Sequence, residues 1–570
     1  MESGRFLLAV VLMIATVVLI NVMFPPARPP RNPTVDSIVG GTPPPIADST
    51  PTPDRPAPRP RQPIAPTVAG TAAETLIVQS PLFRYALSTH GAQLVSAELL
   101  RYESFTRGQT DQGMRPPVQL VPASSGRLLG HRVRVDGRDI DFSKVRFSPV
   151  DSKSRVLKEG DAAATIRMAG KDESSQQTLE LAFTFQPGDY LTEVMARVNP
   201  GGRSVQILLD LGPTLAVNEA NATEDRRALA YVVNGRQSGI QNVPLQSVRP
   251  RRDDGAAGAV RIEEGPLDWI ALKNKYFLVA ALPRTLAGTS AFGGLMATDA
   301  PGRWSVDLTA TLPAGSDQQA GYQLYIGPQD YDRQIALGLE DVNPMGWRWL
   351  RPIMRPLGHA FTWVLLSSHR ATGLPYGWVI ILFGFAVRLA LWPLNAKAMR
   401  SQLKSMELQP RMKDIQTRYK ANPELMQKEM LKLYREEGFN PMGGCLPILL
   451  PMPVLIALFF VFQSTIEFRG VSFAWLPDLS RADPLFILPI LLGVTMFIGQ
   501  WLSLRTSPPN PQAQVMLWVL PGMMTFFFLN FASGLNLYYV AQQLAGFPQQ
   551  LKLIQERREY QASRGLLAKT

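Results

Sequence analysis

Five apolar stretches follow one another in the C-terminal part of the chain, and they constrain the fold more than any other feature. They cover residues 374–394, 443–463, 485–502, 514–531 and 535–551. A helix needs about 20 mostly apolar residues to cross the hydrocarbon layer of a bilayer, and each stretch reaches or approaches that length. The pattern predicts five clustered membrane spans, and the three residues "ASG" between the last two predict a tight turn at Ser533 and Gly534.

A sixth apolar run, residues 6–24, lies near the N-terminus, and no small-residue cleavage site follows it. It predicts an uncleaved anchor over residues 1–24. Residues 25–74 then carry dense prolines, as in "PPARPPRNP". Proline removes amide donors and favours extended chain, so this segment is predicted to be a linker. A ligand for proline-binding modules is the less favoured alternative.

Residues 75–340 show short alternating segments separated by turn residues, such as "LELAFTF" and "SVQILLDL". Alternation of apolar and polar residues is typical of strands with one buried face. The pattern predicts a large antiparallel β-sandwich domain. Its size would also suit a sugar-binding module, which remains an open alternative.

Residues 345–368 have basic and apolar side chains on opposite faces of a predicted helix. The basic face carries Arg348, Arg351, Arg355 and His359, and the apolar face carries Trp347, Leu350, Met354, Leu357 and Phe361. This predicts an amphipathic helix at the membrane surface, bent at Pro352 or Pro356. A helix packed on the β domain is the alternative.

Basic residues are concentrated between the second and third spans and in the tail, residues 556–570, whereas residues 464–483 contain only Arg469 and Arg481. By the positive-inside rule the basic segments face the cytoplasm. Six spans then place both termini inside and the β domain outside. Within the predicted membrane core, residues 373–555, the basic loop 396–438 is expected to form a helical hairpin, with Asn422 capping its second helix and Pro423 in that helix's first turn.

Arg388 interrupts the second span, in "ILFGFAVRLALWPLN". An arginine at the centre of a bilayer helix costs about 3 kcal/mol on insertion scales, and such residues usually face a wet cavity or a partner. Alternatively, its side chain could snorkel to the interface near Trp392.

The sequence lacks the residues that several classes of membrane enzyme and transporter need. No predicted span contains the histidine or the aspartate pair of an intramembrane protease, and no phosphate-binding loop of the G-x-x-x-x-G-K-[ST] type is present. No duplicated half suggests a secondary transporter. One cysteine and four scattered histidines predict no metal site. The chain is therefore expected to be neither an enzyme nor a pump, and to need no cofactor.

Five segments resemble the YidC membrane-protein insertase family in its Gram-negative form. They read "DWIALKNKYFLVAALP", "FAVRLALWPL", "FNPMGGCLPILLPMPVLIALFF", "DPLFILPILLGVTMFIGQ" and "FASGLNLYYV". The resemblance implies an insertase and chaperone of the bacterial inner membrane, acting alone or beside the Sec translocon. Its implied partners are nascent membrane-protein clients, the ribosome, targeting factors and the bilayer. An envelope binding protein that uses its spans only as an anchor is the rival interpretation.

The resemblance also implies a hydrophilic groove that opens to the cytoplasm and to lipid and is closed on the periplasmic side. The residues at the matching positions are Arg388, Tyr538, Tyr539 and Gly384, the last where a threonine is familiar. A client slide is implied along Pro451, Phe459, Phe460, Phe526 and Phe527, with Pro451 standing where a glutamine is familiar. Both departures would make the groove less polar.

Overall fold

The structure is a computed structural model that describes most of the chain from residue 74 onward. The described residues are 74–106, 115–123, 127–150, 154–200, 204–247, 260–284, 291–299, 306–313, 318–346, 350–393, 408, 411–412, 414–420, 422–437, 452–505 and 511–563. The predicted anchor, nearly all of the proline-rich linker, Pro451 and the last seven residues of the basic tail lie outside them. Backbone contacts divide the chain into two compact units.

The first unit spans Met1–Asp189, Glu193–Arg226 and Leu312–Gly321, and its described part consists mainly of strands. One sheet has the order β4 (Pro117–Gln119), β3 (Leu94–Glu103), β2 (Phe83–Ser88), β1 (Thr75–Gln79), β8 (Arg155–Val156). Its pairs are antiparallel except for β1 and β8, which run parallel. The predicted antiparallel arrangement is therefore wrong at this one edge, where the short β8 joins.

Further strands of this unit form two antiparallel groups. The first group is β6 (Arg138–Asp141), β5 (Gly130–Val135) and β12 (Val205–Asp210), and the second is β11 (Leu191–Asn199), β10 (Thr178–Phe185), β9 (Ala164–Lys171) and β7 (Phe147–Pro149). A short helix, α2 (Ala222–Ala228), follows β12. Alternate residues of β10 are buried, as the sequence pattern predicts. The ring of Phe185 on β10 lies 6.3 Å from those of Phe83 and Tyr85 on β2, so aromatic side chains join the two sheets.

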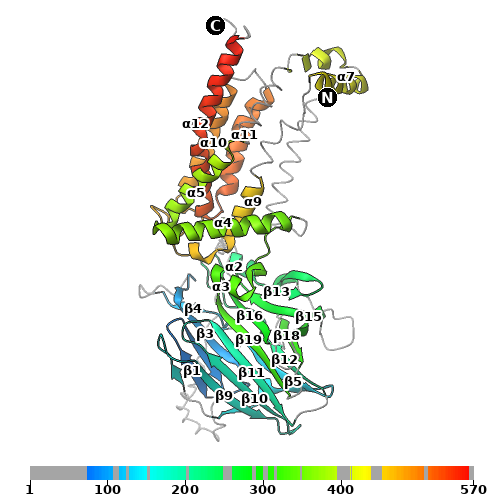
Figure 1. Ribbon diagram of the computed structural model, residues 1–570, viewed down its shortest axis with the longest axis vertical. Helices are drawn as coiled ribbons and strands as arrows, with labels where there is room; N and C mark the ends of the chain where they lie inside the picture. Colours follow the sequence, from blue (N-terminus) through cyan, green and yellow to red (C-terminus); the bar gives the residue numbers. More distant parts are fainter. Residues whose placement is uncertain are drawn as a thin grey trace, which may run out of the picture. The chain divides into compact units, whose positions relative to one another are not determined.

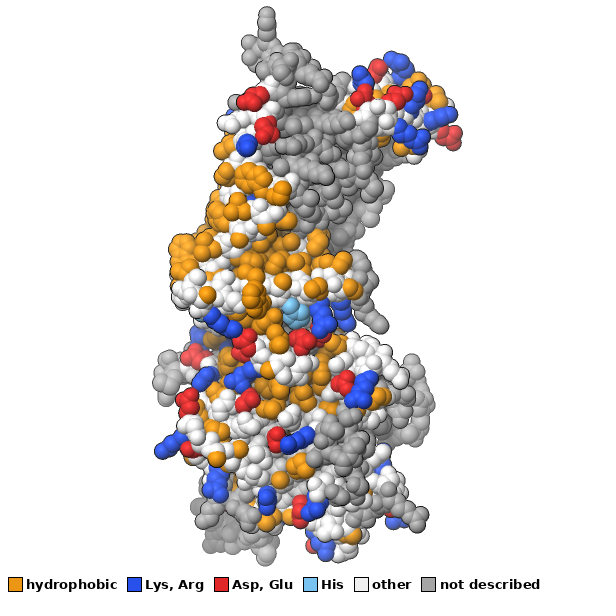
Figure 2. Space-filling model, viewed as in Figure 1, with side chains coloured by type: hydrophobic (Ala, Val, Ile, Leu, Met, Phe, Trp, Pro, Cys, Tyr) orange, Lys and Arg blue, Asp and Glu red, His pale blue; other side chains and the backbone are white. Residues whose placement is uncertain are grey.

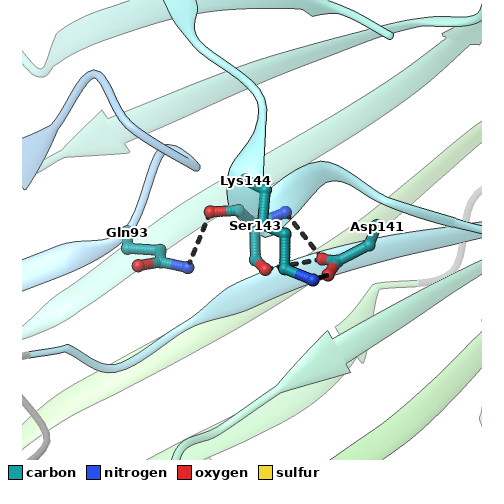
Figure 3. Close-up of polar contacts among 4 residues, drawn as sticks. All are labelled: Gln93, Asp141, Ser143 and Lys144. Carbon is teal, nitrogen blue, oxygen red and sulfur yellow. Dashed lines mark hydrogen bonds and ion pairs between the residues drawn. The ribbon is translucent and has the colours of Figure 1, made fainter. Parts of the chain in front are cut away.

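A tight connection after β6 shows how polar side chains stabilise this domain (Figure 3). Asp141 caps the turn η1 (Phe142–Lys144), because its Oδ1 accepts a hydrogen bond from the Ser143 amide at 3.0 Å. The Lys144 ammonium lies 3.4 Å from the same carboxylate, and the Gln93 amide donates to the Ser143 carbonyl oxygen at 3.4 Å. These side chains thereby provide hydrogen-bond partners for backbone groups that are not paired within a β-sheet.

The second unit spans Tyr190–Thr192, Arg227–Thr311 and Tyr322–Thr570. Its strands are β13 (Ala230–Gly235), β14 (Gly239–Pro244), β15 (Val260–Lys273), β16 (Phe277–Arg284), β17 (Phe292–Asp299), β18 (Val306–Pro313) and most of β19 (Gln319–Pro328). β15 is central, since it pairs with β13, β16 and β17. The short elements η2 (Leu245–Ser247), α3 (Tyr331–Leu337) and η4 (Glu340–Val342) complete this part.

Helices make up the rest of the second unit. They are α4 (Arg351–Thr372), α5 (Tyr376–Ala390), α7 (Pro423–Glu436), α9 (Met452–Ser464), α10 (Ile487–Leu504), α11 (Pro511–Phe528) and α12 (Ser533–Ser563). Among the described residues, α10 is long and apolar enough to cross a membrane; Tyr376–Ala390, Met452–Ser464 and Gln514–Phe528 are apolar but shorter. The predicted break between the last two stretches is confirmed. It lies at residues 529–532, so Ser533 and Gly534 begin α12 rather than form the turn.

α4 runs crosswise to α10, α11 and α12 (Figure 1). It continues as a helix through both Pro352, in its first turn, and Pro356. On one side Met354 is buried, and on the other the Arg355 guanidinium lies 2.7 Å from the Asp341 carboxylate. Adjacent positions of the helix therefore meet an apolar and a charged environment.

Buried side chains of α4, α5, α9, α10, α11 and α12 form one apolar core, which includes Leu365, Ile380, Leu458, Leu488 and Tyr538. Figure 2 shows hydrophobic side chains covering much of the visible helical surface, with charged side chains concentrated over the strands and over α7. An apolar exterior of this kind is the surface that lipid requires.

α7 is the second helix of the predicted hairpin. Its cap is confirmed, since the Asn422 side chain accepts a hydrogen bond from the Leu425 amide at 3.2 Å and Pro423 lies in the first turn. Of the predicted first helix, residues 411–412 and 414–418 are helical, and residues 396–407 lie outside the described part of the chain.

Candidate functional site

Arg388 lies in the last turn of α5 with its side chain half-buried. Its guanidinium rests against the bare Cα of Gly546 on α12, because a methyl group built on that Cα would lie 2.7 Å from Nη2 and 2.9 Å from Cζ. Its Nε has no hydrogen-bond partner, and among the described residues no carboxylate forms an ion pair with it. A charge held in this way among apolar helices is a candidate functional group.

Tyr538 and Tyr539 lie near the start of α12. The ring of Tyr538 is fully buried and lies 5.8 Å from that of Phe383 on α5. Tyr539 points to a different neighbour, with its ring 5.2 Å from that of Phe528 on α11. Both hydroxyl oxygens are buried, and neither has a hydrogen-bond partner among the described residues. Two polar groups are thus held inside an apolar helix bundle, Tyr538 toward α5 and Tyr539 toward α11.

Gly384 lies one turn before Arg388, at the contact between α5 and α12. A methyl group on its Cα would lie 3.1 Å from the carbonyl oxygen of Tyr538 and 3.2 Å from the Cβ of Ala541. The two helix backbones therefore approach closely, and a larger side chain would push them apart. The structure places Gly384 in this packed contact.

Gln549 and Gln550 are polar residues of the same region that the sequence interpretation missed. Gln549 is buried, its Oε1 has no partner in the described part of the chain, and its Nε2 donates to the Trp392 carbonyl oxygen at 3.5 Å. Gln550 lies against Gly499 of α10, and its Oε1 is also unpaired. A signal was present, since Gln549 follows Tyr538 by about three helical turns and so lies on the same face of α12.

At the end of the bundle away from Arg388, residues 465–486 form a hydrogen-bonded loop between α9 and α10. We call this end of the bundle the loop end. Asp483 caps α10: its Oδ1 accepts from the Leu485 amide at 3.0 Å, and its Oδ2 accepts from the Leu488 amide at 2.8 Å and from Trp475 Nε1 at 3.4 Å. The first residue of α12, Ser533, donates its amide to the Arg481 carbonyl oxygen at 2.6 Å. The loop and the start of α12 are therefore fastened together.

Comparison with known proteins gives consistent matches. The family described as 60Kd inner membrane protein matches residues 367–560, and the YidC periplasmic domain matches residues 75–359. The membrane protein insertase YidC of Chlorobaculum tepidum is 31% identical over 500 residues, which cover 84% of this chain and 81% of that protein. The chain belongs to the YidC family of membrane protein insertases. The insertase YidC of Coxiella burnetii is 28% identical over 567 residues and 96% of both chains.

Among solved structures, an active YidC insertase with its first transmembrane domain resolved matches with 19% identity and a TM-score of 0.33, over 85% of this chain and 93% of that one. As a YidC insertase, the chain is an inner membrane protein with a periplasmic domain and is not an enzyme. The predicted family, the large periplasmic β-sheet domain and the helical membrane region are confirmed. The rival interpretation of an anchored binding protein is wrong, because the helical region itself matches.

Four of the residues expected to form the client slide, Phe459, Phe460, Phe526 and Phe527, lie on α9 and α11, and Pro451 lies outside the described residues. The ring of Phe459 lies 5.5 Å from that of Phe460 and 5.3 Å from that of Phe531, and the ring of Phe527 lies 4.6 Å from Phe531. Phe526 points outward with 62% of its surface exposed. The structure thus joins Phe459 and Phe527 through Phe531, a residue that the sequence interpretation did not include.

Proposed function

We propose that this insertase receives client spans in a groove beside α5 and α12, with Arg388, Tyr538 and Tyr539 as its polar groups and Gly384 at its floor. The observation that carries the proposal is the half-buried Arg388, which has no ion pair among the described residues and lies in a strip of unpaired polar atoms. Buried polar groups are normally hydrogen-bonded to protein or water. Unpaired ones suit a surface whose partners are water and an arriving polypeptide.

The free energy of inserting a client span favours a mechanism without an energy source in the insertase. Burying about twenty apolar residues of a client span is worth roughly 6 to 12 kcal/mol on insertion scales. Insertion is therefore downhill and needs no nucleotide, and the barrier is the polar flank that must cross. A polar groove shortens the apolar distance, and the Arg388 cation attracts an acidic flank. The membrane potential contributes about 2.3 kcal/mol per charge for each 100 mV.

The proposed topology has six spans, with both termini in the cytoplasm. It is supported by the basic residues of the hairpin and tail, and by the hydrogen-bonded loop end, which suits the closed periplasmic side of a groove that opens to the cytoplasm and to lipid. The proposed partners on the cytoplasmic side are nascent clients, the ribosome and targeting factors, with the Sec translocon beside the bundle. The aromatic surface of Phe459, Phe460, Phe526 and Phe527, with Pro451, is the proposed client slide.

Purified protein in liposomes tests the proposal. It should insert a single-span client without nucleotide, and the Arg388→Glu variant should lose insertion of a client with an acidic translocated flank by about tenfold, the equivalent of one charge interaction of about 1.4 kcal/mol. A client with a neutral flank should change little, and Arg388→Lys should keep most activity for both. Equal losses for the two clients, in a variant that stays folded, would show that Arg388 serves structure rather than client binding.

A further inference from the structure

Gly546 lies inside α12, where a glycine needs a specific reason. In a helix interior glycine is less favourable than alanine, because it loses more backbone freedom on folding. The three atoms nearest to a methyl group built on its Cα are Nη2, Cζ and Nε of Arg388, at 2.7, 2.9 and 3.1 Å. The space that a side chain at position 546 would fill is therefore taken by the guanidinium.

Gly384, the other glycine at the contact between α5 and α12, has different neighbours from Gly546. A methyl group there would meet the backbone of α12, with the Tyr538 carbonyl oxygen at 3.1 Å and the Gln542 amide at 3.4 Å. A substitution at Gly384 would therefore move a helix, whereas a substitution at Gly546 would move only the end of a flexible side chain. The two glycines of this helix pair have different roles, helix contact for Gly384 and room for a cation for Gly546.

We propose that Gly546 is a positioning residue that sets where the Arg388 cation stands in the groove. The inference rests on the proposed function of Arg388 in client binding. The guanidinium occupies the space beside the bare Cα, and this holds it close to α12. Any side chain at this position would displace the guanidinium from α12 toward solvent, and an acidic client flank would then meet a hydrated and more weakly attracting charge.

Gly546→Ala tests this with a single added methyl group. Gly522 on α11 supplies the matched control, because a methyl group there would meet nothing within 4 Å. In liposomes, Gly546→Ala should insert the acidic-flank client several-fold more slowly while the neutral-flank client changes little. Gly522→Ala should match the parent protein for both clients. Melting temperatures of the two variants in detergent should not fall, since alanine favours the helix.

A second change separates displacement of the guanidinium from a general effect of the methyl group. Lysine has an unbranched ammonium that can pass beside the methyl group where the planar guanidinium cannot. Arg388→Lys should therefore restore acidic-flank insertion several-fold in the Gly546→Ala background, although it gives no gain in the parent protein. Equal effects of Arg388→Lys in both backgrounds would overturn the proposal.

The position of the guanidinium can also be measured without any client. Phenylglyoxal labels exposed guanidinium groups, and mass spectrometry reports the Arg388 peptide. Labelling of Arg388 should be several-fold faster in Gly546→Ala than in Gly522→Ala, and equal rates would overturn the inference. If Arg388→Glu showed no preference between clients while labelling still rose in Gly546→Ala, the proposed function would fail and the positioning by Gly546 would stand.

Discussion

The two ends of the helix bundle differ in how far their buried polar side chains are paired. At the loop end, Asp483 accepts three hydrogen bonds, and the buried Asp478 carboxylate accepts from both the amide and the hydroxyl of Ser480. Along the opposite part of α12, the Arg388 Nε and the Gln549 Oε1 have no partner among the described residues. In an apolar environment an unpaired polar group is expensive. Pairing is therefore extensive among the loop-end aspartates and incomplete beside Arg388, where we propose that the client enters.

Among the changes that test this comparison, loss of the Asp483 carboxylate should have the largest effect on the free energy of unfolding. Asp483→Ala leaves the Leu485 and Leu488 amides and the Trp475 indole without their acceptor. Three unmade hydrogen bonds, one of which comes from the first turn of α10, should lower the free energy of unfolding by roughly 4 kcal/mol. Thermal unfolding of the purified protein measures this. Asp483→Asn, which keeps one acceptor oxygen, should lose clearly less, and equal losses would mean that the carboxylate does not fasten the loop.

Glu467 provides a further test of this comparison, because it is a loop-end carboxylate with a hydrogen-bond partner on only one of its two oxygens. Its Oε1 accepts from the Tyr331 amide at 3.2 Å, while its Oε2 has no partner in the described residues. Burial, together with the nearby Asp330 and Asp332 carboxylates, raises the pKa of Glu467 to about 7. The loop end thus contains one group that titrates near neutral pH.

The contribution of Glu467 to stability should therefore fall as the pH rises between about 4.5 and about 7, while buried His131, whose pKa burial lowers to about 4, contributes with the opposite sign. In that range the folded protein holds a proton on Glu467 that the unfolded chain has already released, so raising the pH favours unfolding. The full effect is about 3 kcal/mol for a shift of this size. The melting temperature of the parent protein relative to that of Glu467→Gln should therefore decline across this pH range. The same slope in both proteins would assign the pH dependence to other groups.

Local patterns explain which parts of this fold could be predicted from the sequence. Strand alternation in β10 and the Asn422 cap of α7 depend on neighbours in the chain, and both were predicted correctly. The length of α12 exceeds its apolar stretch, because the hydropathy falls near residue 551 while the helix continues through polar residues to Ser563. Hydropathy reports what surrounds a helix, whereas hydrogen bonding decides how far it continues.

The candidate site was less predictable for a related reason. Arg388 stands out in the sequence, since a charge in an apolar run is visible without any partner. The role of Gly546 depends on a side chain from α5 that lies 158 positions earlier in the chain, and no local pattern around position 546 indicates it. Residues that act by leaving space are found only when the neighbour that fills the space is known.

The smallest expected effect comes from Gln549, and it tests the comparison between the two ends most directly. Gln549→Leu removes a buried Oε1 that has no partner among the described residues, and loses only the 3.5 Å contact of Nε2 with the Trp392 carbonyl oxygen. Replacing a poorly paired amide by an apolar group of similar size should change the free energy of unfolding by less than about 1 kcal/mol, toward greater stability.

Ser480→Ala is the matched change at the loop end, because the Ser480 hydroxyl donates to Asp478 Oδ1 at 2.7 Å. This change should cost about 1 kcal/mol, since one buried hydrogen bond is lost. Removal of one polar side chain should thus have opposite signs at the two ends, while only Gln549→Leu slows insertion of clients with polar flanks. If Gln549→Leu destabilised the protein as much as Ser480→Ala does, Gln549 would be a structural residue. The contrast between the loop end and the end that contains Arg388 would then not hold at this position.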